Sequence, residues 1–150
     1  MAASPLAVRT AQTAWEGPLA SGSGTLASGS GALDGQRVTW AARTEAPGGK
    51  TSPEELCAAA HSSCFSMALA LKLAEAGSPP QRLDVSATVA LAEADGVPTI
   101  TTSAVEVRAT VPGLQQDAFD AIVADAAALC PVSRLFAGAE VTVSASLAGA

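Results

Sequence analysis

The hydrophobic and polar pattern is most regular between Ser52 and Gly77, where it predicts one long helix. Ser52 suits the N-cap and Pro53 the first helical position. More than twenty residues without Gly or Pro follow, and Gly77 then ends the helix. Between positions 58 and 73 only Lys72 is charged. We therefore expect other structure to cover most of the helix circumference.

The residues before this helix predict a β-meander over positions 7 to 45. Short strands around Val8–Trp15 and Gly24–Ala27 are separated by Gly, Ser and Pro turn signals. The near-repeat SGSGTLA and SGSGALD is interpreted as a hairpin of closely packed small residues, because Leu26 and Leu33 need burial.

The segment GQRVTWAART ends the meander and is predicted to be a strand. Apolar and polar residues alternate along it: Val38, Trp40 and Ala42 against Arg37, Thr39 and Arg43. Alternation places Arg43 on the opposite face from Trp40. The loop PGGKT then leads into the long helix.

Two strands joined by a turn at Asp95–Gly96 are predicted after the helix. In the first, LDVSATVALAE, five apolar residues alternate and share one face: Leu83, Val85, Ala87, Val89 and Leu91. In the second, TITTSAVEVRATV, the apolar positions change phase between Ile100 and Val105, which predicts a bulge or a twist.

The rest of the chain predicts two helical segments and a last strand. Apolar residues at helical spacing fill Gln115–Leu129. Cys130 and Pro131 break that helix, VSRLF predicts another short turn, and EVTVSASL alternates as a strand. This element order predicts an α+β fold of antiparallel sheets, with helices between or against them, in a single domain covering residues 1–150.

Composition narrows the possible functions. With 150 residues, of which 49% are hydrophobic, the chain can bury a core. The net charge is −6 and the eight Lys and Arg are scattered, which argues against a nucleic-acid surface. No apolar run is expected to cross a membrane, and the N-terminal residues do not resemble a signal peptide. The chain is therefore predicted to be cytoplasmic.

The long helix also carries the candidate chemistry. Cys57, His61 and Cys64 lie at i, i+4 and i+7 and therefore share one helical face. Three interpretations are open: a buried stripe with a hydrogen-bonded histidine, a Cys₃His metal site completed by Cys130, or a redox thiol. Against the metal site, the chain has no pair of cysteines on a tight turn.

The redox interpretation depends on what surrounds each thiol. Cys130 precedes a new helical turn, where free backbone N–H groups lower a thiol pKa. Cys64 lies in mid-helix and needs an external cation, for which Arg43 is the candidate. Glu54 is suited to hold that guanidinium in a bidentate pair, whereas Glu55 is better suited to capping. A surface ion pair is the alternative for Arg43 and Glu54.

Sequence motifs show a resemblance to a known family. PEELCAAAHSSCFSMALALKLAEAG resembles the signature helix of the OsmC/Ohr family, named for osmotically inducible protein C and organic hydroperoxide resistance protein. CPVSRLF is similar to its second cysteine motif, and TWAARTE is closer to the OsmC branch. The likeness runs from about Gly22 to Leu147. Cys57, where the family usually has a small residue, is a departure.

The resemblance implies an OsmC-like fold and a cofactor-free, metal-free thiol peroxidase that reduces organic hydroperoxides. Cys64 matches the peroxide-attacking cysteine and Cys130 the resolving one. Arg43 and Glu54 match the charged pair that activates the first thiol. The implied cycle forms a sulfenic acid and then a disulfide, which an external dithiol reduces; a lipoyl-type dithiol is one candidate. A non-catalytic metal- or ligand-binding protein on the same fold is the alternative.

An intertwined homodimer is predicted from helix geometry together with the resemblance. Glu54 and Cys64 are ten residues apart on one helix, about 15 Å along its axis. If Arg43 and Glu54 activate Cys64, at least one of them is expected to come from a partner chain.

Overall fold

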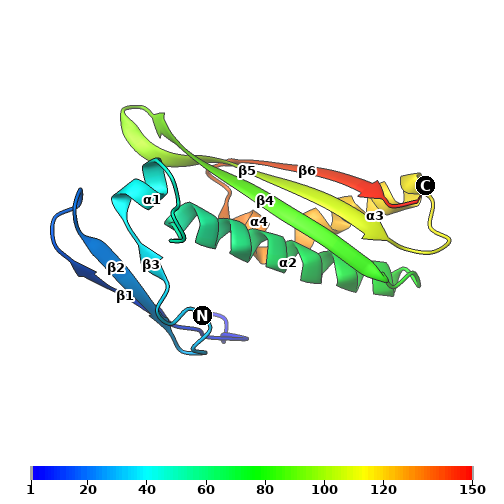
Figure 1. The fold of residues 1–150 in the computed structure, drawn as a ribbon. Coiled ribbons are helices and arrows are strands. Elements are labelled where there is room, and N and C mark those ends of the chain that lie inside the picture. Colours follow the sequence, from blue (N-terminus) through cyan, green and yellow to red (C-terminus); the bar gives the residue numbers. More distant parts are fainter. Residues whose placement is uncertain (1, 150) are drawn as a thin grey trace. The chain divides into compact units, whose positions relative to one another are not determined.

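The computed structural model describes residues 2–149 and divides into two compact units, Met1–Pro53 and Glu54–Ala150. Each unit is described by itself. The first holds a small sheet, and the second holds a larger sheet with the long helix (Figure 1). The prediction of a single domain stays a prediction.

The first unit contains a three-stranded antiparallel sheet in the order β1-β2-β3. Its strands are β1 (Ala11–Glu16), β2 (Ser23–Ser28) and β3 (Arg37–Val38). Leu26 on β2 is buried, as predicted. The meander prediction is confirmed in outline, because three consecutive strands pair in sequence order.

The hairpin predicted within the near-repeat is wrong. Its first copy lies in β2, but its second copy forms the turns between β2 and β3, and Leu33 there is only half-buried. Polar groups hold these turns: the Ser28 N–H donates to Asp34 Oδ1 at 2.8 Å, and the Leu33 N–H donates to Ser28 Oγ at 3.1 Å. In this segment, Ser and Asp side chains accept the backbone hydrogen bonds that a paired strand would otherwise accept.

The strand predicted through Trp40 and Arg43 is also wrong beyond Val38. Residues Trp40–Thr44 form a short helix, α1. Thr39 caps it by accepting the Ala42 N–H at 3.0 Å. In a helix, i and i+3 are neighbours, so the Arg43 guanidinium lies over the Trp40 ring at 5.9 Å instead of on the opposite face.

The long helix α2 spans Pro53–Glu75, which confirms the prediction. It ends in a Schellman arrangement: the Ser78 N–H donates to the Leu73 carbonyl at 2.9 Å, and Gly77 has φ +75°. One side of α2 is buried and the other is open, since Phe65 is fully buried and Met67 is 73% exposed.

By length and composition α2 could cross a membrane, contrary to the expectation that no apolar run was long enough. Its packing gives another reason for its apolar character. Phe65, Leu69 and Leu73 are fully buried in the core of the second unit. Because α2 supplies one wall of that core, its hydrophobicity is that of a core helix.

The second unit contains a mixed sheet in the order β4-β5-β6. Its strands are β4 (Arg82–Ala94), β5 (Val97–Thr110) and β6 (Glu140–Leu147). The predicted bulge is present, because the register shifts where Ala90 pairs with Thr102 and Leu91 with Ile100. The expectation of antiparallel sheets fails for β6, which pairs with β5 in parallel.

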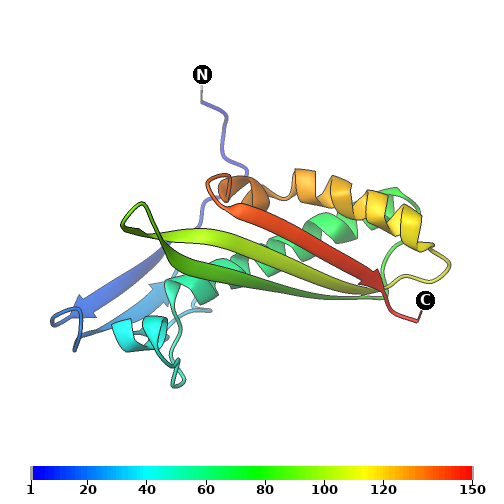
Figure 2. The ribbon, with the colours of Figure 1, turned by 90° about the horizontal axis from the view of Figure 1, so that it is seen from above.

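A helical crossover explains the parallel pairing. The chain leaves β5, runs through α3 (Gln116–Leu129) and α4 (Pro131–Leu135), and returns as β6 in the direction of β5. Figures 1 and 2 show α2 and α3 along one face of this sheet. The core between the layers is built from α2, β5 and α3, and Cys130 belongs to it.

Candidate active site

Cys64 and Cys130 meet in the core of the second unit. Cys64 is half-buried on α2, next to the core residue Phe65. Cys130 is fully buried between α3 and α4, where its N–H donates to the Ala126 carbonyl at 2.9 Å. The two thiols are close enough that each shifts the pKa of the other, so the fold brings together the two cysteines that the sequence singled out.

The surroundings of Cys130 stabilise its thiolate. Burial alone raises the pKa of this thiol, but hydrogen bonds outweigh burial and the net shift is downward. They come from the Ser133 hydroxyl, the Ser133 backbone N–H, the Cys64 thiol and the Val132 backbone N–H. The prediction that backbone N–H groups after Cys130 lower its pKa is confirmed.

The pKa of Cys64 moves in the opposite direction. Burial raises the pKa of the Cys64 thiol, and the neighbouring Cys130 raises it further. The backbone N–H of Val132 on α4 lowers it in part. These opposite directions make Cys130 the more acidic thiol of the pair.

His61 lies one turn before Cys64 and is fully buried. Its Nδ1 is 2.6 Å from Ser103 Oγ on β5, and its Nε2 is 2.8 Å from Ser133 Oγ on α4. The Phe136 ring lies 5.2 Å from the imidazole, centroid to centroid. Burial lowers the pKa of His61. His61 is therefore a buried, hydrogen-bonded histidine, as the first of the three sequence interpretations expected. It lies beside the two cysteines on which the redox interpretation depends.

Sequence reasoning missed both serines. Ser133 carried a usable signal, because a hydroxyl three residues after Cys130 lies in the first turn of the helix that Pro131 begins. Ser103 carried none, since it lies within a strand of alternating residues, and only the fold brings it to His61.

The Cys₃His metal arrangement is not formed. Throughout residues 2–149, no three His, Cys, Asp or Glu side chains are grouped so that they could hold a metal ion. Both ring nitrogens of His61 face serine hydroxyls. Cys57 remains a half-buried free thiol on α2.

The charged candidates lie in different units. Arg43 is on α1 in the first unit, and Glu54 is in the first turn of α2 in the second. Glu54 is buried, at 9% exposed, whereas Glu55 is exposed. Their role in activating Cys64 stays a prediction.

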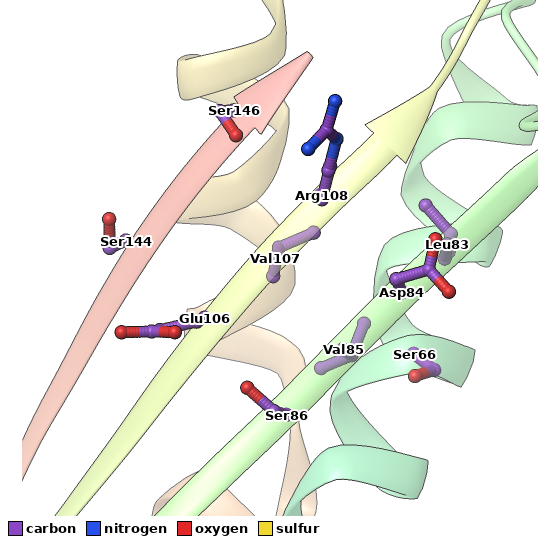
Figure 3. Close-up of a pocket in the computed structure, with 10 residues that line it drawn as sticks. All are labelled: Ser66, Leu83, Asp84, Val85, Ser86, Glu106, Val107, Arg108, Ser144 and Ser146. Carbon is purple, nitrogen blue, oxygen red and sulfur yellow. The ribbon is translucent and has the colours of Figure 1, made fainter. Parts of the chain in front are cut away.

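One hollow in the second unit contains no thiol. It has a volume of about 610 Å³ and lies over β4, β5 and β6 (Figure 3). Polar side chains dominate its lining, including Asp84, Glu106 and Arg108. Its residues offer hydrogen bonds but no redox group, so the chemistry is assigned to the cysteine pair.

Comparison with known proteins assigns this chain to a family. The family model described as OsmC-like protein matches residues 46–146. The chain belongs to the OsmC-like family. Peroxiredoxin OsmC of Escherichia coli is 42% identical over 136 residues, which cover 91% of this chain and 94% of that protein. The same identity and coverage hold for Peroxiredoxin OsmC of Shigella flexneri.

Solved structures agree with this OsmC-like assignment. The organic hydroperoxide resistance protein OhrB of Bacillus subtilis has a TM-score of 0.70 and 26% identity, over 92% of this chain and 97% of that one. An organic hydroperoxide resistance protein from Elizabethkingia anophelis has a TM-score of 0.74 and 26% identity, over 95% and 98%. The predicted α+β, OsmC-like fold class is confirmed.

Proposed function

We propose that this protein reduces organic hydroperoxides to alcohols through a Cys64 sulfenic acid and a Cys64–Cys130 disulfide, which an external dithiol then reduces. The chain is a cysteine-based peroxidase of the OsmC type, by its identity to proteins named Peroxiredoxin OsmC. The observation that carries the residue assignment is that the two thiols lie together at the core, where each shifts the pKa of the other. Two sulfurs in such proximity need little movement to form a bond.

The reaction starts from a pair of thiols that holds one proton. That proton shifts to Cys130, and the Cys64 thiolate attacks the terminal oxygen of the hydroperoxide. The O–O bond breaks, and the leaving alkoxide takes the Cys130 proton to become the alcohol. Cys64 is then a sulfenic acid and Cys130 a thiolate.

The second step forms the disulfide. The Cys130 thiolate attacks the Cys64 sulfur, the S–O bond breaks, and the hydroxide that leaves is protonated by solvent to water. Both electrons come from the two sulfurs, so the reaction requires no metal or cofactor. An external dithiol, for which a lipoyl-type dithiol is a candidate, returns two electrons and two protons.

Arg43 and Glu54 are proposed to favour the first proton shift. A guanidinium beside Cys64 stabilises its thiolate, and a buried carboxylate is suited to hold that guanidinium. Glu54 lies about 15 Å from Cys64 along α2. We therefore propose a homodimer in which at least one of the two charged residues comes from a partner chain. We place this reaction in a reducing cytoplasm, where the thiols are returned to the reduced state between turnovers.

Peroxide consumption with a dithiol reductant tests the reaction, using an alkyl hydroperoxide and hydrogen peroxide in parallel. The apolar surroundings of Cys64 favour the alkyl substrate. Cys64→Ser is expected to abolish turnover, and Cys130→Ser to stop after one attack. Cys57→Ser is the matched control and keeps activity. Full activity in Cys64→Ser contradicts the proposal.

A subunit-exchange experiment tests the shared site. Cys64→Ser and Arg43→Ala proteins, each inactive alone, are mixed and allowed to exchange subunits. A site built from both chains restores measurable activity in the mixed dimer. Absence of recovery after verified exchange, or a fully active monomer, contradicts the shared site but leaves the peroxidase reaction standing.

A further inference from the structure

His61 is a buried titratable group that the proposed reaction does not use. It is fully buried, and each ring nitrogen faces a hydroxyl: Ser103 on one side and Ser133 on the other. Ser133 lies in the first turn of α4, three residues after Cys130, and its hydroxyl lowers the pKa of the Cys130 thiol. Two hydrogen bonds therefore join Ser103, His61 and Ser133 in a row that ends beside the resolving thiol.

We infer that His61 and Ser133 form a hydrogen-bond relay that holds Cys130 as the thiolate that attacks the Cys64 sulfenic acid. The inference rests on the proposed peroxidase function for that step alone. In this relay Ser133 donates to the reacting sulfur, whereas His61 acts through Ser133 and is a positioning residue.

Counting protons fixes the direction of the relay. The Ser133 hydroxyl has one proton, so when it donates to the Cys130 thiolate it can only accept at His61. His61 must then carry its proton on Nε2 and donate to Ser133 Oγ across 2.8 Å. Its Nδ1 is left to accept the Ser103 proton across 2.6 Å. This single neutral tautomer satisfies all three hydrogen bonds.

The environment of the relay favours this neutral tautomer. Burial lowers the pKa of His61, which keeps the ring uncharged near neutral pH. Cys64 on α2, Ser103 on β5, and Ser133 with the Val132 N–H on α4 face the relay, and of these only Cys64 titrates. A neutral His61 that donates to Ser133 keeps the serine proton directed at Cys130.

The relay acts on the second chemical step. After the first step Cys130 has lost its proton to the alkoxide and must remain a thiolate until it attacks the sulfenic sulfur. A fixed Ser133 donor stabilises that charge, because hydrogen bonds to ionised groups are the strong ones. Without the donor, Cys130 regains a proton from solvent and the attack slows.

Thiolate absorbance against pH tests the relay without any peroxide. The background is Cys57→Ser, Cys64→Ser, in which Cys130 is the one thiol left. Ser133→Ala should raise the Cys130 pKa by about one unit, a tenfold loss of thiolate below the pKa. His61→Leu should raise it too. His61→Gln, whose amide can still donate near the Nε2 position, should keep the parent titration.

One further variant serves as the matched control for the titration. Ser63→Ala removes an exposed α2 hydroxyl that bonds the Ala60 carbonyl, and should change nothing. If His61→Leu does not fold, Ser133→Ala, the loss of one oxygen atom, still decides. An unchanged Cys130 pKa in Ser133→Ala overturns the relay.

Single-turnover kinetics with an alkyl hydroperoxide give the second readout, in proteins that keep Cys64. In Ser133→Ala, sulfenic acid formation should not slow, because a less acidic Cys130 takes up the proton of Cys64 more readily, while disulfide formation slows about tenfold near pH 7. The difference should shrink as the pH rises through the Cys130 pKa of the variant, above which the thiolate forms unaided. A purely structural defect slows disulfide formation at every pH and overturns the inference. If the parent protein consumes no hydroperoxide, the proposed function fails while the absorbance titration still decides the relay.

Discussion

Acidification from pH 6.5 towards pH 5 should destabilise this protein through His61. In the folded state the imidazole is fully buried and its pKa lies below the ordinary value of 6.5. Above pH 6.5 the ring is neutral in both states and contributes no pH dependence. Below it, the unfolded chain binds a proton that the folded protein does not, so the free energy of unfolding falls as the pH falls. The loss ends at the folded pKa.

The size of this effect is limited by one proton. One proton of difference gives a slope of about 1.4 kcal/mol per pH unit. Over the window from pH 6.5 to about pH 5 the loss is at most about 2 kcal/mol. The window is clean because His61 is the only histidine in the sequence and carboxylates ordinarily titrate near pH 4.

Urea unfolding at several pH values within this window measures the slope. His61→Gln cannot bind the proton, so its free energy of unfolding should stay level over the same window. A level profile for the parent protein would refute the burial argument. So would a slope of equal size in His61→Gln, because another group would then be responsible.

Two more predictions follow from the thiols and the core. One equivalent of organic hydroperoxide should link Cys64 to Cys130 and leave Cys57 free. Cys57 and Cys64 are about 10 Å apart along α2, whereas a disulfide needs Cα atoms within about 7 Å. Peptide mapping that finds mainly a Cys57–Cys64 disulfide contradicts this prediction. Phe119→Ala should lower the free energy of unfolding by about 3–5 kcal/mol, since Phe119 is fully buried. Leu135→Ala, at an exposed position, should change the free energy of unfolding by less than about 0.5 kcal/mol. Similar losses in both variants contradict the assigned core.

The sequence correctly predicted features that neighbouring residues determine, such as the ends of a helix and the position of a bulge. Pro53 and Gly77 bounded α2, and the phase change after Ile100 located the bulge in β5. The strand through Trp40 failed because five residues are too few to separate alternation from a capped helical turn. Thr39, which caps that turn, carried the missed signal.

Long-range features were harder to predict. The parallel pairing of β6 follows from a crossover through two helices, which a list of alternating segments does not reveal. The two cysteines were found by motif, but the hydroxyls beside His61 were not, because Ser103 and Ser133 meet only after the sheet and α4 pack against α2. Sequence order alone does not place such side chains together.

The position of Cys130 on the crossover between β5 and β6 gives its disulfide a mechanical consequence. A bond from α2 to this crossover closes a loop that contains β4, β5 and α3. In the chain-entropy treatment, closing a loop of this length lowers the conformational entropy of the unfolded chain. The folded state is thereby stabilised by about 4 kcal/mol. Oxidation should therefore raise the melting temperature. Because the disulfide stabilises the folded protein, folding stabilises the disulfide by the same free energy. The external dithiol must therefore be strongly reducing to break it.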